Sequence, residues 1–387
     1  MSNYEKRGVS SQKEDVHAAI SKLPPTLYPG AFCHAVADPF DPKSENLFLH
    51  HADGAGTKSS LAYLYWRETG DASVFRGVAE DAVVMNTDDL LCVGAVENFL
   101  VSSAIGRNKS LIPGEILKEI ISGTQAFLEK LNSYGVNAIL TGGETADVGD
   151  LVRTLIVDAT VTTRLHKKDF LDASEIKTGQ SIIGLASFGQ TSYETTYNAG
   201  MGSNGLTSAR HELFKKDYAK KYPESFDPGL PMEVVYTGSL SLTDPLPGTP
   251  VDMGKAVLSP TRTYLPVMRQ IFGECRSSIS GVIHATGGGQ TKCLKFGRGI
   301  HYVKEDLFPF PPLFQKLAEK TPLREMFQVF NCGHRLEIIC DPAAEKTILE
   351  IAKTFRLEAR KIGRTEPSKR MGVNHLTIRN SNETFEY

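Results

Sequence analysis

Three short apolar segments of this 387-residue chain each run directly into a glycine-rich turn that carries polar side chains. The segments and their turns are 47–49 with 50–58, 136–140 with 141–147, and 279–285 with 286–289. Turns of this kind follow strands in α/β and α+β proteins, and their backbone N–H groups can hold phosphates. Strand-like and helix-like segments alternate around them, which predicts an α/β or α+β fold. The length is sufficient for two domains of ordinary size.

The first turn, 50–58, carries one carboxylate, two glycines, one hydroxyl and one ammonium group. Gly54 and Gly56 allow close backbone approaches that a Cβ would block, and Lys58 adds a full positive charge. Asp53 offers the hard oxygen that Mg²⁺ prefers. The glycine spacing differs from that of the Walker motif. The residues alone therefore leave open both a phosphate–Mg²⁺ site and an ordinary strand–turn–helix connection.

An acidic helix is expected over 76–93, where apolar residues recur near helical spacing. Asp81 and Asp88 are seven residues apart and so lie on one face, two turns apart. A buried carboxylate without a partner is costly. The pattern therefore indicates either a metal-binding or catalytic carboxylate, with Asp88 and Asp89 as the best candidates, or a solvated helix edge.

The remaining periodicity gives a coarse map of the chain. In the first half we expect strands over 45–52, 96–105, 136–140 and 151–163, and helices over 59–67, 76–93 and 113–131. In the second half we expect strands over 181–187, 279–285, 301–304, 335–340 and 358–362, and helices over 207–218, 261–273, 313–320, 323–330 and 343–355. The polar stretch 167–179 marks the predicted boundary, which gives an N-terminal domain over 1–170 and a C-terminal domain over 171–387. A short helix at 13–23, an irregular lid or insertion at 222–250 and a loosely held tail from Thr365 complete the map.

Charge and composition restrict the function classes. A formal net charge of −2 gives no electrostatic case for a nucleic acid or an anionic membrane as partner. No apolar run approaches the roughly 20 residues that span a bilayer, and residues 1–13 lack the apolar core of a signal peptide. The six cysteines form no C-x-x-C pair, which favours reduced thiols. We therefore expect a cytoplasmic protein that acts on a small molecule.

Seven motifs occur in the order seen in the aminoimidazole ribonucleotide synthetase family, also called phosphoribosylformylglycinamidine cyclo-ligase. They are Asp53-Gly-Ala-Gly-Thr-Lys58, Asp89-Leu-Leu-Cys-Val-Gly94, Gly142-Gly-Glu-Thr-Ala146, Ser203-Asn-Gly205, Ser259-Pro-Thr-Arg262, His284-Ala-Thr-Gly-Gly-Gly289 and Val329-Phe-Asn-Cys-Gly333. The chain resembles this family over roughly 45–365, and seven ordered motifs are far more specific than one. The resemblance implies a two-domain α+β fold, with an N-terminal sheet that forms a barrel across a homodimer and a C-terminal ferredoxin-like layer.

The resemblance also implies a reaction and a set of site residues. The family closes formylglycinamidine ribonucleotide to aminoimidazole ribonucleotide with ATP and Mg²⁺, and such phosphoryl chemistry needs positioning and charge neutralisation more than a protein nucleophile. The implied metal ligands are Asp53 and Asp89, and the implied catalytic residues are Asp89, Lys58 and His284. The implied ATP contacts are Asp53, Gly54, Gly56, Thr57, Lys58, Gly142, Gly143 and Glu144, and the implied substrate contacts are Ser203, Asn204, Gly205, Thr286, Gly287 and Gly288. A hydrogen-bonded structural role is the alternative for His284, and a structural pair is slightly favoured for Arg262.

The sequence departs from the family pattern at several positions. Gly202 stands where the family usually has a histidine, and Asp88 stands where it usually has an asparagine. Candidates to replace the histidine are Tyr193, Glu194 and Tyr197. These departures leave two alternatives to the cyclo-ligase: a kinase-like relative, such as a thiamine-monophosphate kinase or a selenophosphate synthetase, and a homologue that binds nucleotide without turnover.

Overall fold

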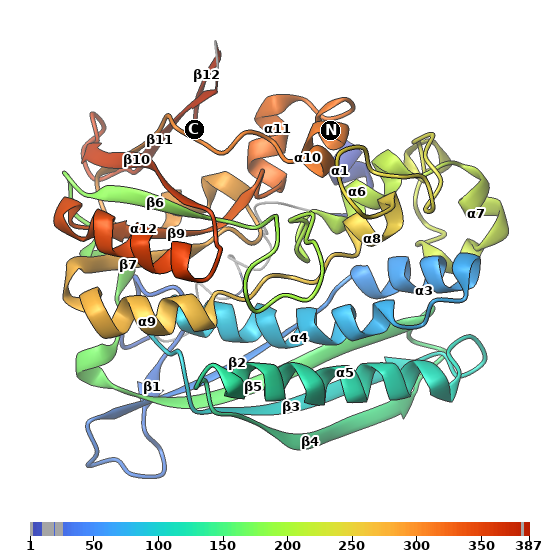
Figure 1. Ribbon diagram of the computed structural model, residues 1–387, viewed down its shortest axis with the longest axis horizontal. Coiled ribbons are helices and arrows are strands. Elements are labelled where there is room, and N and C mark those ends of the chain that lie inside the picture. The colour runs from blue at the N-terminus through green and yellow to red at the C-terminus, as the bar shows by residue number, and fades with distance from the viewer. Residues whose placement is uncertain (1–2, 10–18, 20–25, 381–382) are drawn as a thin grey trace.

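The computed structural model describes residues 3–9, 19, 26–380 and 383–387, and these residues form two β-sheets with their own helices (Figure 1). The strands are β1 (Val36–Ala37), β2 (Asn46–Gly54), β3 (Phe99–Arg107), β4 (Ala138–Asp147), β5 (Leu155–His166), β6 (Ser181–Ala186), β7 (Ile279–His284), β8 (Ile300–Lys304), β9 (His334–Cys340), β10 (Ala359–Pro367), β11 (His375–Asn380) and β12 (Glu383–Glu386). The α-helices are α1 (Asn3–Lys6), α3 (Lys58–Thr69), α4 (Val74–Leu91), α5 (Gly114–Ser133), α6 (Leu206–Leu213), α7 (Asp217–Lys221), α8 (Met253–Val257), α9 (Leu265–Cys275), α10 (Pro312–Ala318), α11 (Leu323–Val329) and α12 (Glu345–Thr354). The helix expected over 13–23 lies outside the described residues, apart from residue 19.

The first sheet has the strand order β1-β2-β5-β3-β4, in which only β3 and β4 run parallel. Alternate residues of β5 are buried, as its apolar–polar alternation predicts, and the buried face packs against α4. Helices α4 and α5 lie on the same side of the sheet (Figure 1). On the opposite face Leu100, Ile139 and Ile156 keep 47%, 52% and 41% of their surface exposed.

The second sheet has the order β12-β11-β8-β10-β6-β9-β7. Its central strands β6 and β9 are buried along their whole length. Helix α12 packs on β6 and β10 and also contacts α9 (Figure 1). The two sheets meet where α4 of the first half contacts α9 and β7 of the second half. The change from one sheet to the other falls between β5 and β6, and the predicted two-part α+β fold is confirmed.

The turn expected over 141–147 is a strand. β4 continues beside β3, and a register shift just before Ser103 accommodates Gly142 at a φ of 108°. A Cβ on Gly143 would lie 2.1 Å from the backbone oxygen of Ser103, so glycine is what lets the strands pair here.

Two predicted helices have different bounds for identifiable reasons. The helix expected over 207–218 is interrupted at Phe214, because the backbone N–H of Lys215 donates to the oxygen of Leu240 in the insertion. The helix expected over 261–273 begins only at Leu265, because the preceding N–H groups donate to buried carboxylates of α4. Tertiary hydrogen bonds override the local preference in both places.

The tail from Thr365 is ordered in the described residues, contrary to the prediction. β10 reaches Pro367, and β11 and β12 extend the second sheet. A short edge strand is covered on one face only, so many of its residues can be polar. Its sequence is then difficult to tell from that of a loop. Among the described residues, no helix combines the length and apolar character needed to cross a bilayer.

Candidate active site

An aspartate and a histidine from the two halves of the chain meet where the sheets approach each other. Asp89 comes from the last turn of α4, and His284 ends β7. His284 Nδ1 lies 2.7 Å from Asp89 Oδ1, while Asp89 Oδ2 lies 3.6 Å from Nε2 of His51 on β2. The predicted catalytic residues Asp89 and His284 are therefore in direct contact, across 195 positions of sequence.

The ionisation states of this pair follow from its surroundings. Burial alone would raise the pKa of Asp89, but the hydrogen bond from His284 and the charges of His51 and Lys292 outweigh it and lower that pKa. Burial, assisted by the charge of Arg335, lowers the pKa of His284 to about 4. An ionised carboxylate only accepts, so Nδ1 of neutral His284 carries the proton and Nε2 keeps its lone pair. That Nε2 is buried and has no hydrogen-bond partner in the described part of the chain.

The first glycine turn places a second acid beside Asp53. Gly54 is paired with Asp158 of β5, and a Cβ on Gly54 would lie 1.7 Å from Asp158 Oδ1. Burial and the nearby charge of Asp53 both raise the pKa of Asp158. Two carboxylates held close together fit a divalent cation. Asp158 was not singled out from the sequence, where the one available signal was a lone acid within an alternating strand.

A cavity of about 440 Å³ adjoins the same turn. Gly56 and Thr57 line it together with Thr207 and Arg210, and Thr57 Oγ1 lies 2.9 Å from Thr207 Oγ1. The turn 50–58 and the segment that follows Ser203-Asn204-Gly205 are therefore neighbours in space. Three arginines, 7, 153 and 210, and two acids, Glu224 and Asp227, contribute to the lining, and Arg7 is paired with Glu212 at 2.6 Å.

Lys58 points away from this cavity and into the interior. Its Nζ donates to Asp81 Oδ1 at 2.7 Å and to the backbone oxygen of Ser259 at 2.8 Å, and its side chain is wholly buried. Thr261 N donates to the same Asp81 oxygen at 2.7 Å. Burial lowers the pKa of Lys58 although Asp81 opposes the shift. In this conformation the ammonium group joins α3, α4 and the segment before α9.

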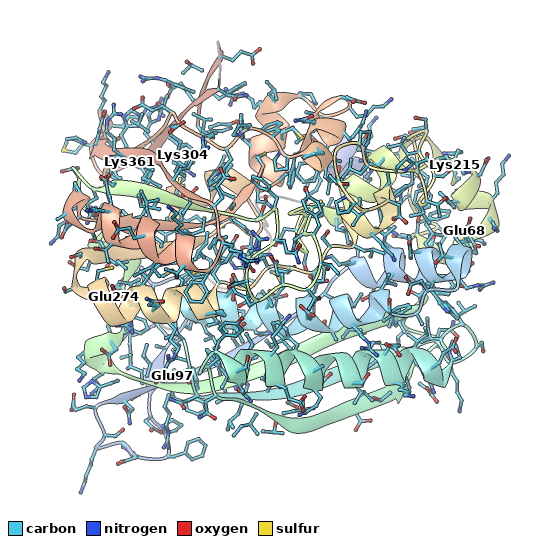
Figure 2. All side chains as sticks on the ribbon, in the orientation of Figure 1. Glu68, Glu97, Lys215, Glu274, Lys304 and Lys361 are labelled. Carbon is cyan, nitrogen blue, oxygen red and sulfur yellow. The ribbon has the colours of Figure 1, made fainter. Side chains whose placement is uncertain are left out.

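The other predicted binding segments are spread over two regions. Ser203 Oγ lies 3.1 Å from Thr261 Oγ1, and Gly205 begins α6 in the left-handed conformation. Thr286 receives a hydrogen bond from Lys292 at 3.2 Å, one turn into the 3₁₀ helix η6 (Gly289–Lys295) that follows Gly287 and Gly288. That helix is fixed to the second sheet by Lys304 (labelled in Figure 2), whose Nζ donates to the oxygen of Gln290 and to Glu337.

Gly142, Gly143 and Glu144 are not near the first turn within one chain. They lie on β4, which is separated from β2 by β5 and β3. Three strand spacings amount to about 14 Å. Glu144 is nevertheless in register with Ala104, and through it with Asp158 and Gly54, in one row across the sheet.

The two departures from the family pattern meet at Arg335, a residue that the sequence analysis did not single out. A Cβ on Gly202 would lie 2.9 Å from Arg335 Nη1, and Arg335 Nη2 lies 3.8 Å from Asp88 Oδ2. Asp88 is fully buried, with hydrogen bonds from Thr263 Oγ1 and Tyr264 N at 2.8 and 3.1 Å. Burial raises the pKa of Asp88 to about 7, against the opposing charge of Arg335. The solvated-edge interpretation of Asp81 and Asp88 is therefore wrong, because both carboxylates are buried and bonded.

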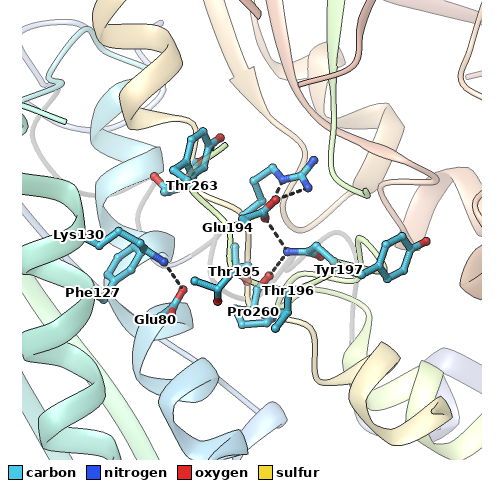
Figure 3. Close-up of a pocket in the computed structure, with 13 residues that line it drawn as sticks. Glu80, Phe127, Lys130, Glu194, Thr195, Thr196, Tyr197, Pro260 and Thr263 are labelled. Carbon is cyan, nitrogen blue, oxygen red and sulfur yellow. Dashed lines mark hydrogen bonds and ion pairs between the residues drawn. The ribbon is translucent and has the colours of Figure 1, made fainter. Parts of the chain in front are cut away.

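The candidates to replace the family histidine lie near a small cavity between α4, α5 and the loop before α6 (Figure 3). Arg262 donates to both oxygens of Glu194 and to three backbone oxygens, which fits the structural role that the sequence favoured. Tyr193 is buried and donates to the backbone oxygen of Thr263 at 2.9 Å. Glu194 and Tyr193 are thus engaged through their side chains, whereas the Tyr197 side chain has no hydrogen bond within the described residues.

Two family models match the chain. The N-terminal domain of AIR synthase related protein matches residues 34–165, and the C-terminal domain of the same family matches residues 177–375. A phosphoribosylformylglycinamidine cyclo-ligase from Methanocaldococcus jannaschii is 27% identical over 331 residues, which cover 84% of this chain and 79% of that protein. One of the same name from Methanococcus vannielii is 26% identical over 383 residues, covering 95% and 93%.

Solved structures share the fold at low sequence identity. Thermotoga maritima PurL complexed with FGAR has a TM-score of 0.54 at 14% identity, over 97% of this chain and 49% of that one. The protein tt0281 from Thermus thermophilus has a TM-score of 0.51 at 15% identity, over 94% and 96%. A thiamine-monophosphate kinase from Stenotrophomonas maltophilia has a TM-score of 0.50 at 12% identity, over 95% and 96%.

Proposed function

Because the chain belongs to the AIR synthase related protein family, we propose that it closes formylglycinamidine ribonucleotide to aminoimidazole ribonucleotide with ATP. The observation that carries the proposal is the Asp89–His284 pair, which joins two of the resemblance motifs at the meeting point of the sheets. The two cyclo-ligases named above, which match over most of their own length, support the same reaction.

His284 is the proposed proton acceptor. In the reaction, the formyl oxygen takes the terminal phosphoryl group of ATP, the amine attacks the formyl carbon, and inorganic phosphate leaves. The attacking nitrogen loses a proton as the ring closes. Nε2 of neutral His284 has the unpaired lone pair to receive it, and Asp89 then stabilises the imidazolium through Nδ1–H.

Phosphate and metal contacts are assigned to the first turn. Asp53 and Asp89 would hold Mg²⁺, with Asp158 as a further carboxylate beside Asp53. The bound ion would neutralise charge that develops on the transferred phosphoryl group. Gly54, Gly56 and Thr57 would face the ATP phosphates beside the cavity of about 440 Å³, which Gly56 and Thr57 line. The segments 203–205 and 286–288 would hold the substrate phosphate through backbone N–H groups. Lys58 acts from the interior, by holding the turn in place.

A homodimer fits the free face of the first sheet. Leu100, Ile139 and Ile156 lie on the side away from α4 and α5, and exposed apolar residues gathered on one sheet face are typical of an interface. Gly142–Glu144 and the first turn belong to the same sheet but stand apart within one chain. We propose that a second copy covers this face.

The proposed role of His284 is tested with the substitution His284→Asn. The asparagine amide occupies the place of Nδ1 and can still donate to Asp89, but it has no counterpart of Nε2. We expect ring closure to fall by about 10² to 10⁴-fold, the usual contribution of a general base. The measurement is formation of aminoimidazole ribonucleotide by mass spectrometry, with His166→Asn at the end of β5 as control. Ring closure at the wild-type rate in a folded His284→Asn variant would contradict the role.

A further inference from the structure

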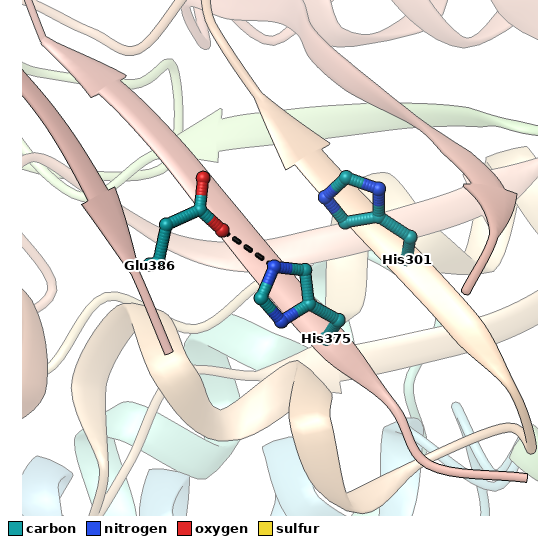
Figure 4. A group of neighbouring side chains, drawn as sticks. All are labelled: His301, His375 and Glu386. Atoms are coloured by element: carbon teal, nitrogen blue, oxygen red, sulfur yellow. Dashed lines mark ion pairs between the residues drawn. The ribbon is translucent and has the colours of Figure 1, made fainter. Parts of the chain in front are cut away.

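Two histidines and a glutamate converge on one face of the second sheet. His301 lies on β8, His375 on β11 and Glu386 on β12 (Figure 4). One potential ligand atom from each lies within 4.8 Å of the others. We propose that these three side chains bind a divalent transition-metal cation, with Zn²⁺ as the chemically preferred ion.

The strand register brings these residues together. His301 and His375 are direct partners in the parallel pair β8–β11, and Thr377 is the direct partner of Glu386 in the antiparallel pair β11–β12. His375 and Thr377 are two residues apart and therefore point to the same face. Glu386 then lies diagonally across from His375, where cross-strand side chains can still meet. The site is thus set by the backbone of three paired strands.

The ligand atoms face a common point. His375 Nε2 lies 2.5 Å from Glu386 Oε2, and Thr377 Oγ1 lies 2.7 Å from His301 Nε2. The single proton of the Thr377 hydroxyl is shared between the two oxygens of Glu386, at 3.0 and 2.9 Å, so Thr377 Oγ1 accepts from His301 Nε2. Zn–N and Zn–O bonds of about 2.0–2.2 Å place tetrahedral ligand atoms about 3.3–3.5 Å apart. The His375–Glu386 pair is closer than this, and the widest separation in the group, up to 4.8 Å, is larger, so the side chains would adjust by rotation on binding.

A second carboxylate, that of Glu366, lies near the Nδ1 atom of His301. His301 Nδ1 lies 3.8 Å from Glu366 Oε2, which is beyond hydrogen-bond length. When Nε2 of a neutral histidine binds a metal, Nδ1 carries the proton, and a carboxylate there fixes the tautomer. Two imidazoles and one carboxylate are a ligand set that suits Zn²⁺, with water completing the shell.

The ion would fasten the end of the chain to the sheet. β12 is a four-residue edge strand, and within the described part of the chain its one strand partner is β11. The family model ends at residue 375, so Glu386 lies beyond the matched segment. This site is therefore independent of the proposed ring closure, and its test does not use the enzymatic reaction.

The test measures Zn²⁺ binding by calorimetry on the full chain, after removal of bound metal with a chelator and exchange into chelator-free buffer. Thermal unfolding with and without Zn²⁺ is followed in parallel. Glu386→Gln keeps the shape of the side chain but removes the anionic ligand, and His375→Asn removes Nε2. Glu383→Gln, on the same strand and outside the group, is the matched control.

We expect one Zn²⁺ per chain that Glu386→Gln and His375→Asn weaken by at least about 100-fold, the upper range for loss of a supporting partner. We also expect the Zn²⁺-dependent rise in melting temperature to disappear in both variants and to persist in Glu383→Gln. Absence of saturable binding by the wild-type chain would overturn the proposal. So would wild-type affinity in the two variants, because the ion would then bind elsewhere. Metal-free melting curves show whether each variant is folded.

Discussion

At the scale of single residues, Arg335 lies beside Gly202 and Asp88, two positions at which the sequence departs from the family pattern. Its guanidinium lies beside Gly202 and faces the buried carboxylate of Asp88, and its charge lowers the pKa of His284. Gly202 leaves the room that Arg335 occupies, and the Asp88 carboxyl, with its pKa raised to about 7, is shared between the charged and neutral forms near neutral pH. We interpret Gly202 as the residue that makes room for the Arg335 guanidinium.

This interpretation predicts the cost of a side chain at position 202. Gly202 has a φ of 70°, and Gly248 has a φ of 77° with no atom near its missing Cβ. Gly202→Ala and Gly248→Ala share the left-handed backbone penalty, so their difference isolates the contact with Arg335. We expect Gly202→Ala to lower the free energy of unfolding by about 1–3 kcal/mol more than Gly248→Ala. Equal losses of unfolding free energy in urea denaturation would contradict the interpretation, because Arg335 would then move aside at no cost.

At the scale of elements, a buried ion pair joins two helices and a segment that are distant in sequence. Lys58 at the start of α3 meets Asp81 of α4, and both bond to the segment 259–261. We expect Lys58→Met to destabilise the protein by about 3–5 kcal/mol, because it leaves a buried carboxylate without its counter-charge. The double variant Lys58→Met/Asp81→Asn should lose less than the sum of the single variants, by about 0.5–3 kcal/mol. Strict additivity in the double-mutant cycle would contradict the coupling.

A buried histidine of α6, His211, holds the insertion at 222–250 through a hydrogen bond. His211 Nδ1 accepts from Tyr236 N at 3.2 Å, and burial lowers the pKa of His211 to about 2. The unfolded chain binds a proton near pH 6.5 that the folded chain does not, so folded stability falls as the pH falls below 6.5. His211→Asn keeps an acceptor for Tyr236 N but does not titrate.

We therefore expect the stability deficit of His211→Asn to shrink by about 2 kcal/mol between pH 7 and pH 5. Urea denaturation at the two pH values measures this change, and His166→Asn serves as the control. The difference between variant and wild type removes the contributions of all other titrating groups. A deficit that stays constant with pH would contradict the assignment.

The sequence predicted best what local periodicity determines. The apolar alternation around Val157 gave β5, and the helical spacing of apolar residues gave α4 within two residues of its observed ends. The prediction was wrong where a residue distant in sequence determines the local structure. The start of α9 depends on Asp81 and Asp88, and the strand character of 141–147 depends on pairing with β3. Lys58 was expected at the ATP phosphates from its charge and from the family resemblance, whereas its Nζ donates to buried Asp81, 23 positions away in sequence.

At the scale of the whole molecule, the proposed chemistry arises only where the two halves meet. α4 supplies Asp89, β7 supplies His284, and β2 supplies His51. Ion pairs further support this junction, such as Glu97 with Arg269 of α9 (Glu97 is labelled in Figure 2). Neither sheet alone carries the pair, which explains why no single motif in the sequence identified the site.

The ring-closure account is tested most directly by measuring ADP and the cyclised product together. Purified protein is incubated with ATP and Mg²⁺, with and without formylglycinamidine ribonucleotide, and both products are quantified by mass spectrometry. We predict that ADP forms only when the substrate is present, with aminoimidazole ribonucleotide in equal amount. ADP release without a cyclised product, or ATP binding with no substrate-dependent turnover, would contradict the account.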